Sequence, residues 1–412
     1  MRNKIFIVFT ILMFSELFAS GGSVYTRYGL GDLYLYNSAR KLSLGGIGTA
    51  ILDNEIVNLN NPATWSAMDN TKFGASMLSN FSIISDENFN ASYSQVKFTG
   101  FHLGLPVQRD YGIGFVIGII PFSTINYDVQ NSYTSGQVNN YQQDFIGSGG
   151  LSKAFFGFSY ILPLDISIGA TLDYYTGNAK YQTTIIYDGT SDFSNSNFTS
   201  EFKYKGLGTT LGLLTPNLAS IFNSDKINNV RLGVSYEISG KLNTDSSGIA
   251  TTAIGETVFE AQSFYTKMPK KLSIGLNFNF DKLIVNLDYV NQPWSKYRQN
   301  EKPSSYLSDL NRYSIGVEFD PNSKKYGTFW ELVKYRGGLS YEQSQYTIKG
   351  LKVNQVGIHT GMSFPLGLEN TIDVGLMYGI RGTTENNLLK EKIFQASFTI
   401  NLGELWFIRP DR

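Results

Sequence analysis

Hydrophobic side chains alternate with small or polar side chains along most of this chain. From residue 113 to residue 119, Ile and Phe occupy every second position, and Gly or Val occupies the positions between them. The same alternation recurs over residues 272–280, 372–380 and 394–402. Successive side chains of a strand point to opposite faces, so each stretch should form a strand with one apolar face and one small or polar face. The pattern predicts an all-β fold.

A soluble β-sandwich also alternates, but three features favour a membrane barrel. The second face carries mainly Gly, Ser, Thr and Asn, which is typical of a barrel lumen. Hairpins counted from Thr71 to Leu402 give about fourteen strands, each with about 24 residues including its connection, which is longer than the repeat of a sandwich. Short and long connections alternate, as in outer-membrane barrels. We therefore predict a transmembrane antiparallel β-barrel of about fourteen strands over residues 71–403.

The connections define the two ends of the predicted barrel. Short turns are expected at residues 106–110, 163–165, 280–282 and 365–370, and long polar loops at residues 124–144, 181–200, 240–262 and 294–310. Two connections on the short side, residues 215–228 and 321–332, are longer than the rule predicts, and we expect a short helix in each. Aromatic residues near strand ends predict interfacial girdles: Tyr160, Tyr174, Tyr175, Tyr236, Tyr289, Trp294 and Trp406.

The N-terminal residues predict export. Arg2 and Lys4 precede the apolar run of residues 5–14, and small residues begin at Ala19. This arrangement is typical of a secretory signal peptide, here residues 1–19. A membrane anchor is the alternative, but the run is too short to span a bilayer as a helix. We expect the chain to reach the outer membrane of a Gram-negative bacterium, with residues 20–70 preceding the barrel and residues 404–412 forming a C-terminal tail.

Composition and charge exclude several classes of function. The chain has 412 residues, with 34 Lys and Arg against 34 Asp and Glu. Because there is no basic excess, we expect no nucleic-acid partner. The chain has no Cys and 2 His, which excludes thiol chemistry and most zinc, haem and iron–sulfur sites. We expect neither a metal nor a cofactor.

The sequence also argues against an enzyme. His102 and His359 are predicted to face the lumen, but they belong to the second and the twelfth strand, which are not neighbours. No Gly-x-Ser-x-Gly motif is present, and no Ser stands at a recognisable spacing from either His. We therefore assign no catalytic residue.

The segment that precedes the barrel contains two motifs. Gly45, Gly46 and Gly48 form a Gly-rich stretch, which lacks the Lys and the flanking elements of a phosphate loop. Its simplest interpretation is close packing where side chains do not fit. The second motif is Asn61, Pro62 and Ala63. Together with the strand count, the two motifs resemble the FadL/TodX family of outer-membrane transport proteins.

The resemblance implies a function and a route. In this family the N-terminal segment folds inside the barrel as a hatch, and the barrel takes up hydrophobic small molecules, such as long-chain fatty acids or aromatic hydrocarbons, without energy input. A kink in the third strand releases them sideways through the wall. Here the third strand contains Gly118 and Pro121, which mark the candidate wall opening. The alternative is that Pro121 ends the membrane-spanning part of that strand.

Charged residues are expected on the lumen face of the strands. They are Asp173, Arg231, Glu237, Asp288, Glu318, Arg336, Glu342, Asp373 and Arg381. Buried single charges are costly, so these residues should pair with each other or with hatch residues such as Arg27, Asp32 and Arg40. We interpret them mainly as locks that hold the hatch. A translocation relay is the alternative interpretation.

Two functions follow from these expectations. The first is a channel for hydrophobic compounds, with outer-membrane lipid, a hydrophobic small-molecule ligand and the barrel-assembly machinery as partners. The second is a non-transporting FadL-like barrel that acts as a scaffold in protein secretion or surface attachment, as PorV does, with a secretion partner. The polar loops at residues 139–144 and 191–200 weaken the first function, whereas apolar residues such as Leu213 and Leu214 are compatible with it.

Overall fold

The computed structural model describes residues 22–404, except residues 88, 136–137, 188–193, 223–225, 322–326 and 368. The predicted signal peptide, Trp406 and the predicted tail beyond Glu404 lie outside the described residues. Among the described residues, no helix is both long enough and apolar enough to cross a membrane.

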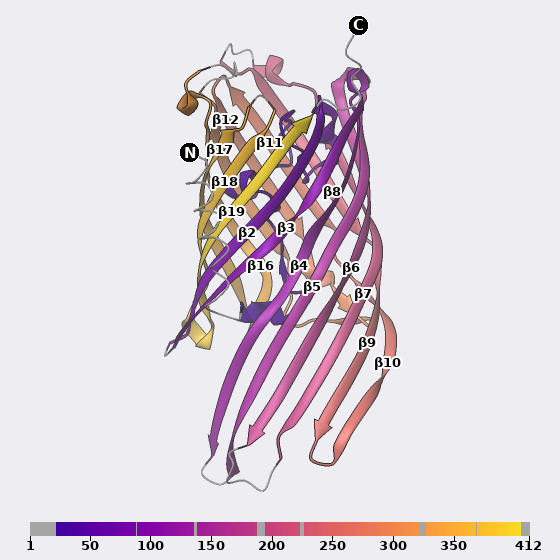
Figure 1. Ribbon diagram of the computed structural model, residues 1–412, viewed down its shortest axis with the longest axis vertical. Coiled ribbons are helices and arrows are strands. Elements are labelled where there is room, and N and C mark those ends of the chain that lie inside the picture. The colour runs from indigo at the N-terminus through magenta and orange to yellow at the C-terminus, as the bar shows by residue number, and fades with distance from the viewer. Residues whose placement is uncertain are drawn as a thin grey trace.

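The chain forms a closed antiparallel β-barrel of 14 wall strands (Figure 1). The strands of the wall are β2 (Thr71–Ser85), β3 (Asn90–Gln108), β4 (Ile113–Ser135), β5 (Val138–Leu162), β6 (Ile166–Tyr187), β7 (Ser196–Leu214), β8 (Asn229–Ser239), β9 (Lys241–Thr252), β10 (Gly255–Lys267), β11 (Lys271–Phe280), β12 (Leu283–Gln292), β15 (Leu310–Phe319), β16 (Lys334–Ile348), β17 (Leu351–Pro365), β18 (Thr371–Gly382) and β19 (Lys390–Glu404). β8 and β9 both pair with β7 and therefore form one interrupted wall strand. β10 pairs with β9 and β11 pairs with β8, so β10 and β11 form a second interrupted wall strand. Pairing of β19 with β2 closes the ring. The predicted fold and strand number are confirmed.

Short elements connect or precede the wall strands. They are η2 (Val24–Arg27), β1 (Asp32–Leu33), α2 (Ala39–Ser43), η3 (Pro62–Ala67), η4 (Arg109–Tyr111), η5 (Pro163–Asp165), η6 (Ala219–Phe222), η7 (Trp294–Lys296), β13 (Arg298–Gln299), β14 (Lys302–Pro303), η8 (Phe329–Glu331) and η9 (Glu385–Asn387). The helices η6 and η8 lie in the two long connections where we expected a short helix, so both predictions are confirmed.

Three segments that we predicted as long loops are largely strand. Residues 124–135 continue β4, residues 241–252 and 255–262 belong to the β9–β10 hairpin, and much of residues 181–200 belongs to β6 and β7. In Figure 1 these strands extend beyond the rest of the barrel, at the end opposite the C-terminus. The loop prediction was wrong because parts of these segments, such as residues 130–132 and 142–144, are polar on both faces and hide the alternation of their neighbours Ile125, Tyr127 and Val129. Backbone pairing, for example between Gln130 and Asp144, continues nonetheless.

The outward face of the wall carries a belt of apolar side chains. Exposed residues such as Ile117, Phe156, Leu172 and Leu207 lie on it, and this arrangement is typical of a lipid-facing surface. Tyr289, Tyr313 and Tyr341 are successive partners on β12, β15 and β16.

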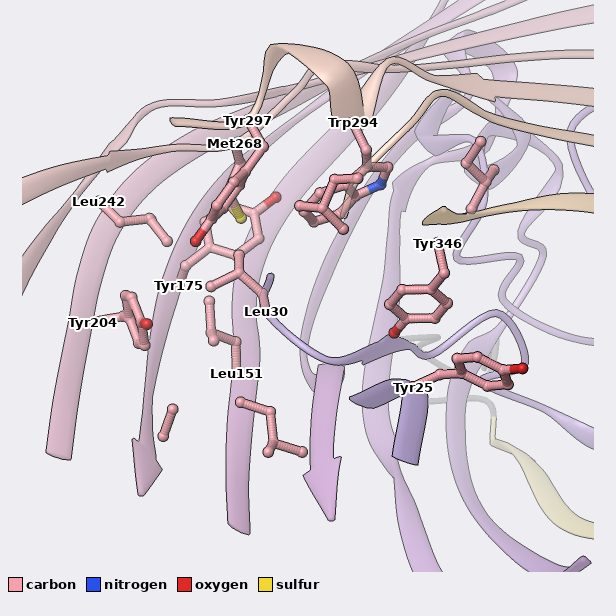
Figure 2. Packing of buried hydrophobic residues seen from close by; sticks show 14 of the residues in the cluster. Tyr25, Leu30, Leu151, Tyr175, Tyr204, Leu242, Met268, Trp294, Tyr297 and Tyr346 are labelled. Carbon is pink, nitrogen blue, oxygen red and sulfur yellow. The ribbon is translucent and has the colours of Figure 1, made fainter. Parts of the chain in front are cut away.

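The aromatic girdle that we predicted is only partly correct. Tyr174 is 41% exposed, and Tyr289 is the register partner of Tyr313. In contrast, Tyr175 and Trp294 are buried in the interior (Figure 2). Tyr175 follows Tyr174 and therefore points to the opposite face, and Trp294 begins η7, which packs inward. Tyr160 and Tyr236 are half-buried.

Residues 22–70 pack against the inner face of the wall, where glycines leave room for them. A Cβ at Gly338 would lie 2.7 Å from the backbone of Leu44, and one at Gly375 would lie 2.5 Å from the carbonyl oxygen of Ala39. A Cβ at Gly169 would lie 2.4 Å from the backbone of Pro62. The barrel lumen therefore holds backbone against backbone, which accounts for part of the high glycine content.

A hydrophobic core joins this segment to the wall (Figure 2). Tyr25 and Leu30 of the segment are buried in one cluster with Tyr175, Trp294 and Tyr346 of the surrounding elements. Tyr25 stacks on Tyr346, with ring centroids 5.9 Å apart. Burial of such aromatic side chains contributes roughly 1.5–3 kcal/mol each relative to exposure, so the packing stabilises the segment inside the barrel.

Candidate functional site

The ladder between β3 and β4 ends early. It extends from Gln108 paired with Ile113 to Phe101 paired with Ile119. Beyond that point, in the described part of the wall, β3 pairs only with β2, and β4 pairs with β5. We call this place, between residues 90–100 of β3 and residues 120–135 of β4, the β3–β4 seam. Beyond Phe101 and Ile119 the two strands no longer pair with each other, so each has an edge without its wall neighbour.

Two backbone irregularities stand where the seam begins. Gly100 has a φ of +116°, and the β2–β3 register shifts beside it. On β4, the register with β5 shifts between Pro121 and Ser123. Proline has no N–H to donate to a neighbouring strand. β4 itself continues past Pro121 to Ser135, and the alternative that Pro121 ends the membrane-spanning part of this strand stays a prediction. Gly118 lies inside the ladder, paired with His102. The role of Gly118 and Pro121 as a wall opening stays a prediction.

The N-terminal segment occupies the edge that β3 leaves free. In β1, Asp32 pairs with Thr124 and Leu33 pairs with Ser123. The backbone N–H of Tyr34 then donates to the carbonyl oxygen of Phe122 at 2.9 Å. The pairing is short, because β1 contains 2 residues.

A lysine bridges the seam through its side chain. Lys97 of β3 donates from Nζ to Thr124 Oγ1 at 3.0 Å. Its Nζ also lies 5.4 Å from the ring centroid of Tyr34. The two edges are thus linked by side chains and by β1 rather than by a direct ladder.

A cavity of about 110 Å³ opens beside the seam. Lys97, Thr124 and Asn126 line it from the two edges, and Asp32 and Arg381 line it from the interior. We call it the seam cavity. Pockets for small molecules typically measure about 300–1,000 Å³. In this conformation the seam cavity has room for a few waters rather than for a large solute.

Ion pairs fix the N-terminal segment beside the seam cavity. Arg381 of β18 donates to the two carboxylate oxygens of Asp32 at 3.0 and 2.9 Å. It also donates from Nε to Glu391 at 2.8 Å and from Nη2 to Ser23 at 2.7 Å. Tyr346 adds a hydrogen bond from Oη to Asp32 Oδ1 at 2.8 Å. The charge of Arg381 is therefore shared between the wall and the segment.

A second network of ion pairs lies deeper in the lumen. Arg40 of α2 and Arg336 of β16 both bind Glu318, at 3.0 and 2.6 Å. Arg336 also binds Asp373 at 2.7 Å, and Arg40 pairs with Asp53 within the segment. These buried charges are all paired, which is what the cost of burial demands.

The two N-terminal motifs make specific contacts with the wall. Asp288 Oδ2 accepts hydrogen bonds from the backbone N–H groups of Gly48 and Thr49, both at 3.0 Å. The carbonyl oxygen of Gly45 accepts from Arg312 at 2.8 Å. A Cβ at Gly46, whose φ is +91°, would lie 3.0 Å from the guanidinium of Arg312, so a side chain there would be strained and crowded.

The Asn-Pro-Ala motif begins η3. Asn61 accepts from the backbone N–H of Ala63 at 3.1 Å and donates to the carbonyl oxygens of Thr49 and Leu213 at 2.8 and 3.0 Å. Pro62 follows as the first helical residue, a position that proline favours. The motif thus starts a short helix and ties it to β7.

The structure brings most of the predicted lumen charges into networks. Asp173 and Glu237 bind Lys153 at 3.6 and 3.3 Å. Glu342 binds Arg312 at 2.9 Å. Arg231 stands apart: it is half-buried and donates to the carbonyl oxygen of Thr215 at 2.8 Å.

Arg27 makes a different contact from the one we expected, and the lumen contains more charged residues than we predicted. Asp32 and Arg40 pair with the wall as expected, whereas the guanidinium of Arg27 lies 5.0 Å from the centroid of the Phe145 ring. We overlooked several charged residues of the lumen: Lys41, Lys97, Lys153, Lys271, Arg312 and Glu391. Strand parity could have found Lys153 and Arg312, which share a face with Phe155 and Ser314.

The two histidines lie on β3 and β17, which β2, β19 and β18 separate. His359 shares a hydrogen bond of 2.9 Å with Ser340, and its ring lies 5.8 Å from that of Tyr36. Within the described residues, no group of three His, Asp or Glu side chains has an arrangement that holds a metal ion.

Solved structures with the same architecture are barrels of the FadL/TodX type. The toluene transporter TbuX of Ralstonia pickettii has a TM-score of 0.60 at 18% identity, with 89% of this chain and 98% of that chain covered. The CymD monoaromatic hydrocarbon channel has a TM-score of 0.59 at 17% identity, covering 92% and 99%. A Pseudomonas aeruginosa FadL homologue has a TM-score of 0.58 at 11% identity, covering 89% and 98%. At these identities the likeness shows a shared fold.

The fold implied by the sequence resemblance is therefore confirmed. A comparison with curated proteins finds no match. The family profile named BamG matches residues 1–411, nearly the whole chain. The protein, a β-barrel with the FadL/TodX fold, thus belongs to the BamG family.

Proposed function

We propose that this barrel is an outer-membrane channel for hydrophobic small molecules, and that they leave it sideways through the β3–β4 seam. One observation carries the proposal: the wall ladder stops at Phe101 and Ile119, and the seam cavity opens farther along the same seam, against Lys97 and Thr124. Structurally similar barrels include a toluene transporter and a monoaromatic hydrocarbon channel. A sideways exit suits such solutes, because they then enter the apolar part of the membrane without crossing water.

Residues 20–70 act as the hatch in this proposal. Free strand edges cannot face lipid without partners, and β1 supplies partners to β4 at Ser123 and Thr124. Withdrawal of β1 would uncover the edge and enlarge the seam cavity. The ion pair of Asp32 with Arg381 opposes this withdrawal. The conformation described here is therefore the closed one.

A disulfide across β1 and β4 tests the proposal. Leu33 and Ser123 are register partners, and the chain has no other Cys. In the Leu33→Cys/Ser123→Cys variant, oxidation should hold β1 on β4 and reduce toluene uptake at least tenfold, and reduction of the disulfide should restore it. The matched control is Ser79→Cys/Ala396→Cys, a register pair in the continuous part of the wall. Uptake unaffected by oxidation of the first pair would overturn the proposal.

A second function is a scaffold for a secreted or surface protein. One observation favours it: the β9–β10 hairpin beyond the apolar belt exposes large apolar side chains. Ile254 is 98% exposed, Val258 65% and Phe259 56%. Exposed apolar residues of this kind are typical of protein contacts. The scaffold predicts a stoichiometric partner protein that co-purifies from outer membranes and is lost in the Val258→Ser/Phe259→Ser variant.

A further inference from the structure

A second cavity inside the barrel is lined by cations. It measures about 100 Å³ and lies against Lys41 of α2, Lys153 of β5, Lys271 of β11 and Arg312 of β15. Glu237 is the single carboxylate among its lining residues. We call it the cationic cavity. On another side it touches the apolar residues Ile120 and Phe122 of β4, next to Pro121.

Three of the four cations have carboxylate partners. Lys153 binds Glu237 and Asp173 at 3.3 and 3.6 Å, Lys271 also binds Glu237, and Arg312 binds Glu342 at 2.9 Å. Within the described part of the chain, Lys41 has no carboxylate in ion-pair contact, and its Nζ makes no hydrogen bond. Lys41 is thus the one of these four cations that has no carboxylate in ion-pair contact in the described part of the chain.

The surroundings of Lys41 disfavour an unpaired charge. Burial, together with the nearby cations Lys271 and Arg312, lowers the pKa of Lys41 to about 7. The carboxylates Asp288 and Glu237 act in the opposite direction. Asp288 Oδ2 already accepts from Thr49 Oγ1 at 2.7 Å, and Asp288 Oδ1 has no hydrogen-bond partner. Lys41 is half-buried and lines the cavity without a carboxylate in ion-pair contact, so a further negative group there would gain a partner.

We propose that the cationic cavity binds an anionic group, such as a phosphate or a carboxylate, that pairs with Lys41 between Lys271 and Arg312. A water molecule takes up about 30 Å³ of liquid, so the cavity accommodates a small oxyanion. Ile120 and Phe122 give the cavity an apolar side, against which an alkyl chain attached to the anion would pack. The anion comes either from solution or from the head group of an amphiphile, and the two sources share the same chemistry.

Calorimetric titration of the purified barrel tests this site. The protein, in a maltoside detergent at pH 6.5 and constant ionic strength, is titrated with inorganic phosphate, octyl phosphate or octyl glucoside. We expect saturable binding of at least one of the two phosphates and none of the glucoside. Lys41→Met should weaken phosphate binding at least tenfold, and Lys41→Arg should keep it within about threefold. Lys349→Met, which removes an exposed cation, is the matched control and should bind as the unchanged protein does.

The outcomes separate the two sources and also test the site itself. Binding of inorganic phosphate that depends on Lys41 assigns the cavity to a free anion. Binding of octyl phosphate alone, again dependent on Lys41, assigns it to an amphiphile head group. Equal binding of octyl glucoside, no binding of either phosphate, or binding unaffected by Lys41→Met would overturn the proposal. The titration measures binding and not uptake, so its result does not depend on the proposed transport function.

Discussion

Arg381 holds both carboxylate oxygens of Asp32, at 3.0 and 2.9 Å, and so connects β18 of the wall to β1 of the N-terminal segment. The two residues are 349 positions apart in the sequence. Because β1 is also the partner of β4 at the seam, this ion pair couples the position of the segment to the closure of the wall.

Asp32→Asn should loosen β1 without unfolding the barrel. Arg381 keeps Glu391 as a partner, so we expect a loss of about 1–3 kcal/mol, the usual effect of a weakened, partly buried charge-assisted hydrogen bond. Hydrogen exchange of the backbone N–H of Tyr34, which donates to Phe122, should accelerate at least tenfold. Glu256→Gln, at an exposed carboxylate of β10, serves as the control. Unchanged exchange at Tyr34 would show that the ion pair does not hold β1.

Gly338→Ala and Gly337→Ala should differ sharply although they are neighbours. A Cβ at Gly338 would lie 2.7 Å from the backbone of Leu44, whereas one at Gly337 would have its nearest atom, the carbonyl oxygen of His359, at 3.9 Å. Overpacking of this kind costs roughly 1–3 kcal/mol. We expect Gly338→Ala to lower the midpoint of thermal unfolding and Gly337→Ala to leave that midpoint unchanged. Equal midpoints would mean that the segment does not press against β16 as described.

Pro121→Val should lower toluene uptake several-fold. Valine supplies the backbone N–H that proline lacks and favours a regular strand, so the β3–β4 ladder can extend past Ile119. Uptake into cells that produce equal amounts of either protein is the measurement. Pro365→Val, at the end of β17, is the matched proline substitution. If Pro121→Val takes up toluene at the original rate, Pro121 has no part in the route.

Lys41 makes stability depend on pH in a defined direction. Its pKa is about 7 in the folded protein, mainly because of burial, against an ordinary value of 10.5. Between these values the unfolded chain binds more protons, so this lysine should make the folded state more stable as pH rises from 7 to 10.5. Lys271, Arg312, Asp288 and Glu237 are the charged groups around it. The thermal midpoint of the unchanged protein, measured relative to Lys41→Met, should rise over this range; a flat difference contradicts the burial.

The wall could be predicted from the sequence because alternation reports directly on strands with two unlike faces. Where both faces are polar, as around Gln130 and Asp144, the signal disappears although the backbone ladder continues. Some single residues were assigned to the wrong face of their strand. Tyr175 is aromatic and lies near a predicted strand end, but parity turns it inward.

The candidate site was harder to predict than the wall. The motif around Asn61 pointed to the segment, yet its partners, such as the carbonyl oxygen of Leu213, are distant in sequence. Lys41 and Lys97 belong to no sequence motif. Their contacts depend on which residues face them in the folded barrel. Pairing between a lumen segment and fourteen wall strands depends on three-dimensional register, which local patterns do not encode.

The most direct test of the sideways route is to locate the solute at the wall. A photoreactive diazirine analogue of toluene, added to the barrel in lipid vesicles and irradiated, labels the residues that it contacts, and peptide mass spectrometry identifies them. We predict labelling on both edges of the β3–β4 seam, at residues 93–98 and 122–126, that excess toluene removes. Labelling that toluene does not compete away, or that spreads evenly over the lipid-facing wall, would contradict the account.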